Sequence, residues 1–257
     1  MSEHFIFGQW NDHQKQIIAL NHIPHKKPED FHKLEKQTEA LEKNIASFVK
    51  GGPFLHTLLW GEMGCGKSSL VKSLLFKHKE NLSALQIRID QLKDLQHIID
   101  THFSNDRQYI IYIDDISLSR SDEDFYFLKT FLDGSFFQVA DNIMMIATSN
   151  RRHLTPEFMS DNQNVTVMED ALHYGDEKND ALALSDRFGL SVSFYTLGKN
   201  DYLELVFQEL QKRTSKPLNK DEIKLHATRY AMQKGGHNGR TAMQCIKYIQ
   251  IMQPALF

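Results

Sequence analysis

The sequence lacks the features of secreted, membrane-spanning and nucleic-acid-coating proteins. Only two cysteines, Cys65 and Cys245, occur among 257 residues, which excludes a disulfide framework and makes a reducing cytoplasm the expected location. The longest apolar runs, such as 109–113 and 143–147, are much shorter than the ~20 residues that a membrane helix needs. The first residues also lack the basic-then-apolar order of a secretory signal. A net charge of −3 argues against a chain whose main role is to coat nucleic acid.

One stretch, residues 58–70, carries the strongest functional signal. Gly61, Gly66, Lys67 and Ser68 match the pattern G-x-x-x-x-G-K-[ST], between an apolar run and a helical pattern. Glycines let backbone amides converge on a polyphosphate, and the start of the following helix adds N–H donors. Lys67 supplies a cation for the β and γ phosphates, and the Ser68 hydroxyl is a ligand for the accompanying Mg²⁺. The expected phosphate-binding residues are Gly61, Glu62, Met63, Gly64, Cys65, Gly66, Lys67, Ser68 and Ser69.

Cys65 lies inside this loop, close to Lys67 and to the expected start of a helix. Such a position favours the thiolate form of a cysteine. Two roles stay open for Cys65: a small residue that fills the loop, or a thiol whose oxidation switches off nucleotide binding.

Carboxylates and an amide at the ends of two later strands complete a candidate catalytic set. Asp114 and Asp115 follow a continuous apolar run, and Asn150 ends the next such run. Asp114 is placed to hold Mg²⁺ together with Ser68, and Asp115 to orient and polarise an attacking water. Asn150 can hold the same water and sense the γ-phosphate. The structural alternatives are an Asp-Asp pair that caps a turn and an asparagine with no role beyond ending its strand.

Two arginines are candidates for stabilising the charge that develops on a transferred phosphoryl group. Arg187 lies just before the last expected strand, and Arg240 lies at the start of the last expected helix. A guanidinium stays ionised and binds phosphoryl oxygens with a planar fork. Either residue can equally be an ordinary surface arginine.

The order of apolar runs and helical patterns predicts an α/β fold with a parallel, doubly wound, five-stranded sheet. We expect an irregular N-terminal arm over residues 1–29, because this segment is alternately polar and aromatic and contains two prolines. A nucleotide-binding α/β domain is expected over 30–197, and a small helical lid domain over 198–257. The expected strands are 55–60, 84–89, 109–113, 143–148 and 191–195.

The C-terminal helical segment differs in charge from the rest of the chain. Residues 198–257 carry ten basic and five acidic residues. A positive lid over an anionic ligand, or a surface that faces an acidic neighbour, is consistent with this excess. Solvated helix faces would produce the same count.

The motifs, in this order, resemble those of AAA+ ATPases. They are the phosphate loop, the apolar strand ending in Asp114-Asp115, Ala147-Thr148-Ser149-Asn150, Ser185-Asp186-Arg187-Phe188-Gly189, and Gly239-Arg240. The residues around these motifs resemble those of one bacterial AAA+ family that is catalogued only as a domain of unknown function. The resemblance implies binding of ATP and Mg²⁺, hydrolysis, and sites shared between the subunits of a homo-oligomer. It also implies that Asn150 is the sensor-1 residue, Arg187 an arginine finger that reaches a neighbour's γ-phosphate, and Arg240 the sensor-2 residue acting in cis.

One position departs from the AAA+ pattern. Most AAA+ enzymes have glutamate where this chain has Asp115. The shorter side chain retracts the carboxylate by roughly 1.5 Å, a displacement of the size that lowers a rate by about 10²-fold. Hydrolysis is therefore expected to be slow, or to use a relayed water.

Two functions of different classes follow from these observations. The first is an ATPase that assembles and couples hydrolysis to the remodelling of an unknown protein partner. The alternative is a slowly hydrolysing, ATP-dependent switch or loader, which Asp115 favours and which can be associated with DNA. Nucleic acid is the less favoured partner, because no aromatic-basic groove or helix-turn-helix pattern is present.

Overall fold

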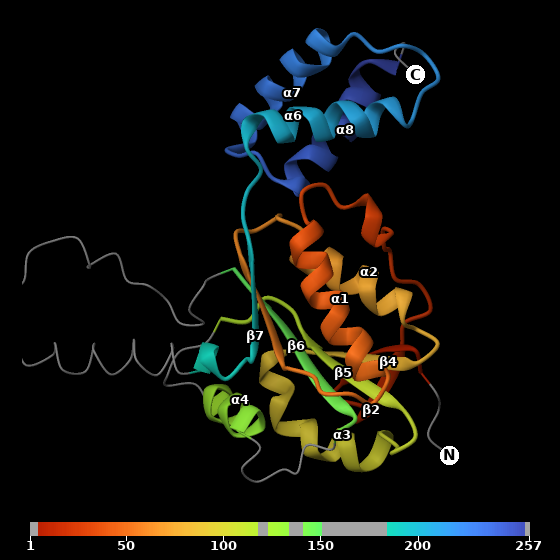
Figure 1. Cartoon of the computed structure of the whole chain (residues 1–257), viewed down its shortest axis with the longest axis vertical. Coiled ribbons are helices and arrows are strands. Elements are labelled where there is room, and N and C mark those ends of the chain that lie inside the picture. The colour runs from red at the N-terminus through yellow and green to blue at the C-terminus, as the bar shows by residue number, and fades with distance from the viewer. Residues whose placement is uncertain (1–4, 118–122, 134–140, 151–183, 255–257) are drawn as a thin grey trace, which may run out of the picture. The chain divides into compact units, whose positions relative to one another are not determined.

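The computed structural model describes residues 5–117, 123–133, 141–150 and 184–254 (Figure 1). The chain divides into two compact units. The first comprises Met1–Trp60 and Ser68–Ser193, and the second comprises Gly61–Lys67 and Phe194–Phe257. The phosphate-loop residues 61–67 thus group with the C-terminal residues.

A seven-stranded sheet forms the centre of the first unit, in the order β2-β1-β4-β5-β6-β3-β7. Its pairs β1/β4, β4/β5, β5/β6 and β6/β3 are parallel, and β1/β2 is antiparallel. Every residue of β6 is buried, as are the last five of β5, which is why both were visible as unbroken apolar runs. The strands are β1 (Phe7–Asn11), β2 (Gln16–Ala19), β3 (Thr57–Gly61), β4 (Leu82–Ile87), β5 (Gln108–Ile113), β6 (Ile143–Ser149) and β7 (Leu190–Phe194).

The N-terminal region corrects the sequence prediction. The five expected strands are present as β3 to β7, but β1 and β2 lie in the segment that was predicted to be an irregular arm. That prediction is wrong for residues 7–11 and 16–19. The strand β1 pairs in parallel with β4, and Trp10 is only 2% exposed. Short strands with mixed polar and aromatic residues are stabilised by such long-range pairing, which local sequence does not reveal.

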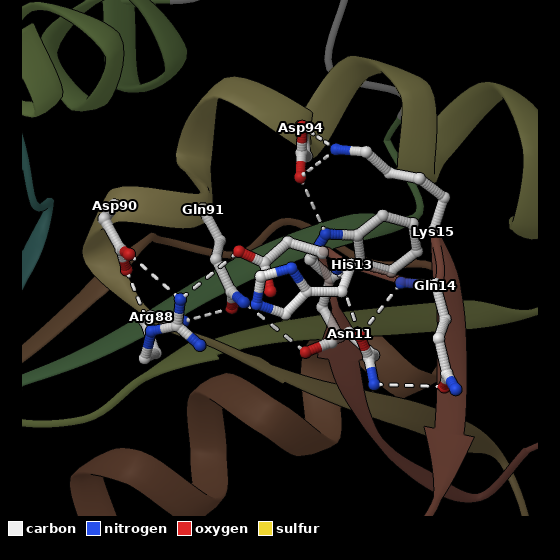
Figure 2. A network of polar contacts seen from close by, with 10 residues as sticks. Asn11, His13, Gln14, Lys15, Arg88, Asp90, Gln91 and Asp94 are labelled. Atoms are coloured by element: carbon white, nitrogen blue, oxygen red, sulfur yellow. Dashed lines mark hydrogen bonds and ion pairs between the residues drawn. The ribbon is translucent and has the colours of Figure 1, made fainter.

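Polar contacts at the tip of the β1–β2 hairpin fasten it to η2 (Ile89–Asp94), as Figure 2 shows. The Trp10 indole Nε1 and the Lys15 ammonium each donate to the Asp94 carboxylate at 2.9 Å. Burial opposes ionisation of Asp94, but these two donors outweigh it and lower its pKa. The hairpin is thus held by a charge-assisted contact in addition to its strand pairing.

The helices of the first unit cover both faces of the sheet, α1 and α2 on one and α3 and α4 on the other (Figure 1). Tyr109, Ile111 and Ile113 of β5 join the core beneath α3 and α4. Because side chains alternate along a strand, Tyr112 and the Asp114 that follows β5 face the side of α2. The helical elements are η1 (Pro28–Asp30), α1 (Glu35–Val49), α2 (Lys67–Lys77), α3 (Leu95–His102) and α4 (Glu123–Asp133).

His56, just before β3, is a partly buried base beside this core. Its Nδ1 accepts a hydrogen bond from the Met145 backbone N–H at 3.1 Å, and its ring packs against Phe131. Burial lowers the pKa of His56 from 6.5 to about 4. Because His56 takes up a proton less readily in the folded protein than in the unfolded chain, acid favours unfolding. The contribution of neutral His56 to the free energy of unfolding is fully present above pH 6.5 and is lost as the pH falls from 6.5 towards 4.

We therefore expect His56 to account for about 2 kcal/mol of the free energy of unfolding that is lost between pH 7 and pH 5. Denaturant unfolding of the parent and of His56→Gln at both pH values measures this. Glutamine can still accept from Met145 but does not titrate, so the loss should shrink by about that amount. Equal losses in the two proteins would show that His56 does not titrate on unfolding.

The second unit contains three helices with a core of their own. They are α6 (Lys199–Gln211), α7 (Lys220–Lys234) and α8 (Gly239–Met252). Asn219 caps α7 by accepting from the N–H groups of Asp221 and Glu222, and Asn238 caps α8 through Thr241. The predicted helical C-terminal region is confirmed. Among the residues that the structure describes, no helix is long and apolar enough to cross a membrane.

Candidate functional site

The loop between β3 and α2 has the backbone that a phosphate-binding loop requires. Gly61, Gly64 and Gly66 have φ angles of 140°, 82° and 101°, which residues with a Cβ rarely adopt. At Gly61 a Cβ would also lie 2.0 Å from the Phe194 carbonyl oxygen. Any side chain here would clash with backbone, so glycine is required for two independent reasons.

Lys67, the first residue of α2, is buried and directs its ammonium back into the loop. The Nζ donates to the carbonyl oxygens of Gly61 at 2.5 Å and Glu62 at 3.0 Å. Only 6% of the residue is exposed. The cation is thus held at the centre of the loop, and binding an anion there involves exchanging these carbonyl contacts for phosphate oxygens.

Asp114 is held by three hydroxyl groups from three elements. Its Oδ1 accepts from Ser68 Oγ of α2 at 2.6 Å, from Tyr112 of β5 at 2.7 Å, and from Thr148 Oγ1 of β6 at 2.7 Å. Burial opposes ionisation of Asp114, but the three hydroxyl donors outweigh it and lower its pKa. Burial, followed by the nearby Asp114 charge, raises the pKa of Tyr112, so its phenol remains a neutral donor. Asp114 is an oriented, charged carboxylate beside the hydroxyl at the start of α2.

Asp115 has a left-handed backbone, with a φ of 58°. Its N–H donates to Thr148 Oγ1 at 2.8 Å, and its Oδ1 accepts from Asn150 Nδ2 at 2.5 Å. Aspartate and asparagine are several times more frequent than other non-glycine residues in this conformation. This backbone gives a physical reason for aspartate where most AAA+ enzymes have glutamate.

The structure therefore brings Ser68, Asp114, Asp115 and Asn150 into one chain of hydrogen bonds. Sequence reasoning missed Thr148, which bonds to both aspartates, and Tyr112. The signal for Tyr112 was its period-two spacing from Asp114 on one strand. Thr148 lies within the Ala147–Asn150 motif, but its contact with Asp114 depends on the register of β5 against β6, which pairs Ile113 with Ala147.

The two arginines lie in different units. Arg187 Nε donates to the Asp133 carboxylate at the end of α4, at 2.5 Å, so in the single chain it contacts its own α4. Arg240 is the second residue of α8, and its backbone N–H donates to the Gly64 carbonyl oxygen at 3.2 Å. Arg240 thus adjoins the phosphate loop within the second unit.

Cys65 differs from the sequence expectation. Burial raises the pKa of its thiol and outweighs the opposing influence of Lys67. The expected preference for the thiolate is therefore wrong, because the side chain is enclosed and only 8% of the residue is exposed. The role as a small residue that fills the loop agrees with this burial.

The oxygen ligands present suit Mg²⁺. A carboxylate and a hydroxyl lie next to each other at Asp114 and Ser68, and Mg²⁺ is usually bound by one or two such groups, with substrate phosphates and water supplying the rest. Within the described ranges no group of three or more histidine, cysteine, aspartate or glutamate residues can hold a metal. These two ligands suit a metal ion that is also bound by phosphate oxygens, and they are too few to bind a metal ion by themselves.

Comparison with solved structures defines the class of the fold. The Thermotoga maritima RuvB Holliday junction branch migration motor matches with a TM-score of 0.59 and 13% identity, over 90% of this chain and 66% of that chain. The Aeropyrum pernix ORC2 protein, in ADPNP-ADP complexes, matches with a TM-score of 0.58 and 14% identity, over 91% and 66%. A DNA replication initiation factor matches with a TM-score of 0.53 and 15% identity, over 90% and 66%. The chain spans about two thirds of the length of these structures.

The fold is therefore that of AAA+ P-loop NTPases, as the sequence predicted. The chain belongs to the family described as a protein of unknown function (DUF815), whose model matches residues 3–252. No curated protein matches the sequence. The resemblance to an AAA+ family known only as a domain of unknown function is confirmed.

Proposed function

We propose that this protein binds ATP with Mg²⁺, hydrolyses it, and couples the cycle to the remodelling of a macromolecular partner. The observation that carries the proposal is the 2.6 Å hydrogen bond between Ser68 Oγ and Asp114 Oδ1. It joins the helix that follows the phosphate loop to the acidic end of β5. These two oxygens are the pair that holds Mg²⁺ beside the phosphates of a nucleotide in P-loop enzymes. The scarcity of cysteine supports a cytoplasmic location.

In this proposal the phosphate-loop residues Gly61 to Ser69 bind the triphosphate. Backbone N–H groups and the start of α2 contact the phosphate oxygens, and Lys67 exchanges its carbonyl partners for the β and γ phosphates. Ser68 and Asp114 hold Mg²⁺, which when bound neutralises charge on the phosphates. The Tyr112 and Thr148 hydroxyls keep Asp114 in one orientation.

Asp115 and Asn150 act on the attacking water. The Asp115 carboxylate accepts a hydrogen bond from the water and increases its nucleophilicity, while the Asn150 amide fixes the carboxylate and contacts the water. Arg240 neutralises phosphoryl charge in cis. Arg187 does so for a neighbouring subunit, which makes the active form a homo-oligomer.

Changing Asp115 to asparagine tests the assignment of the water-activating group. Asparagine tolerates the left-handed backbone as aspartate does, so the fold and ATP binding should persist. Turnover should fall by about 10²-fold or more, because the amide cannot accept the proton. Phosphate release and equilibrium binding of ATP, measured on the same preparation, separate the two effects. Unchanged turnover would remove Asp115 from the mechanism.

A second candidate function is an ATP-dependent switch or loader that hydrolyses slowly. The short Asp115 side chain, already held by Asn150 in the single chain, favours it. Its partner can be DNA, because two of the similar structures are named as a branch migration motor and a replication initiation factor. Partner binding by Asp115→Asn distinguishes the two: a switch stays functional when ATP is trapped, and a remodelling enzyme does not. Salt-dependent binding of single-stranded DNA would identify the DNA-associated form.

A further inference from the structure

We propose that Tyr112 and Thr148 are positioning residues for the metal ion, and that their hydroxyls set the affinity of the site for Mg²⁺ by fixing Asp114. This inference rests on the proposed function and extends it to two residues outside the phosphate loop and the acidic pair. Neither hydroxyl is assigned a direct contact with metal or nucleotide. Both act through the carboxylate.

The geometry that carries the inference is the convergence of hydrogen bonds on a single oxygen. Tyr112 and Thr148 both donate to Asp114 Oδ1 at 2.7 Å, and Ser68 donates to the same atom. Hydrogen bonds from two strands and one helix fix the rotation of the Asp114 carboxylate, and they also decide which of its two oxygens accepts them. The hydrogen bonds to Asp114 from the described residues all end on Oδ1, which leaves Oδ2 as the oxygen to present to a cation.

The two hydroxyls are themselves held rigidly. Tyr112 is 2% exposed and Thr148 is 1% exposed, on adjacent parallel strands. Thr148 Oγ1 also accepts a hydrogen bond from the Asp115 N–H at 2.8 Å, and the Thr148 hydroxyl proton is donated to Asp114. A rigid support lowers the entropy that is lost when a carboxylate binds a metal, and outer partners of this kind typically change metal affinity 10–100-fold.

The Ser68 contact with Asp114 is compatible with a metal ion. Ser68 would bind Mg²⁺ through an oxygen lone pair, which leaves its O–H able to keep donating to Asp114. The Tyr112 and Thr148 hydroxyls donate to the same carboxylate, which is the proposed metal ligand. Removing either hydroxyl should therefore lower the affinity for Mg²⁺ more than the affinity for nucleotide.

The test is Tyr112→Phe, which deletes one hydroxyl and keeps the ring. Isothermal titration of Mg²⁺ into protein saturated with a non-hydrolysable ATP analogue should give a Kd about tenfold higher than in the parent. The affinity for the analogue in the presence of EDTA should stay within about twofold of the parent value. An unchanged Mg²⁺ Kd in a folded Tyr112→Phe variant would overturn the proposal.

Tyr109→Phe is the matched control. Tyr109 lies on the same strand, is 3% exposed, and accepts a hydrogen bond from the Ser104 N–H on the opposite face of the sheet. This variant should keep the parent Mg²⁺ affinity. A Mg²⁺ defect equal to that of Tyr112→Phe would overturn the proposal, because the effect would then reflect the strand and not the contact with Asp114.

Thr148 provides a second pair of variants in case Tyr112→Phe does not fold. Thr148→Val removes the hydroxyl at constant shape, and Thr148→Ser restores it. We expect the valine variant to lose Mg²⁺ affinity and the serine variant to recover it. Failure of serine to rescue would contradict the proposal. A parent protein that binds the analogue equally with and without Mg²⁺ would instead refute the proposed magnesium site itself, and the inference with it.

Discussion

Replacing Lys67 by alanine should weaken ATP binding by about 100-fold, because about 3 kcal/mol of charge-assisted hydrogen bonding to phosphate is lost. The buried ammonium already lies within the loop, between the carbonyl oxygens of Gly61 and Glu62. Alanine leaves both the phosphate charge and these carbonyls without a cation. Calorimetry with a non-hydrolysable ATP analogue and Mg²⁺ measures the change in Kd.

The matched control for this prediction is Lys77→Ala. Lys77 lies at the other end of α2 and forms an ion pair with Glu42 at 2.8 Å, with 47% of its side chain exposed. Its removal takes the same charge from the same helix and should leave the Kd for ATP within about twofold, since exposed ion pairs contribute little. Equal affinity of Lys67→Ala and the parent would contradict the proposed phosphate site.

Replacing Arg187 by alanine should lower turnover by about 10³-fold while ATP affinity stays near the parent value. The physical reason is that an arginine finger acts on charge that develops during phosphoryl transfer and contributes little to ground-state binding. Phosphate release should be measured over a series of protein concentrations. In the parent, activity per subunit should rise steeply with concentration, because in the proposed function the finger acts on the site of a neighbouring subunit.

Asp133→Asn is the control that separates this role from a structural one. Arg187 forms an ion pair with Asp133 within its own chain, and both variants remove that ion pair, so a merely structural arginine would be affected in either one. We expect Asp133→Asn to retain most of the turnover, because it keeps the guanidinium. Equal losses in the two variants, or a rate per subunit independent of concentration, would argue against a finger acting in trans.

The sequence was sufficient for the features that depend on local pattern. The phosphate loop was recognisable because Gly61, Gly66 and Lys67 occupy fixed positions within a few residues, and its glycines adopt the positive φ angles expected of them. The central strands were recognisable because β5 and β6 are almost entirely buried. Burial on both faces produces unbroken apolar runs.

The sequence was insufficient where contacts join distant segments. The strands β1 and β2 are short, and their structure depends on the pairing of β1 with β4 and of β2 with β1. The thiol of Cys65 was expected to favour the charged form because of nearby Lys67, but its enclosure was not visible and proves to be the larger influence.

The sequence by itself determined the class of fold and the phosphate loop, because both follow from residue type and spacing along one stretch of chain. Only the tertiary structure decided how the carboxylates are held. Thr148 of β6 meets Asp114 and Asp115 because β5 and β6 pair in one register, and it joins Tyr112 of β5 on the Asp114 carboxylate. Register is fixed by the packing of the whole sheet, and a one-residue slip of β6 against β5 would turn Thr148 to the other face of the sheet from Asp114.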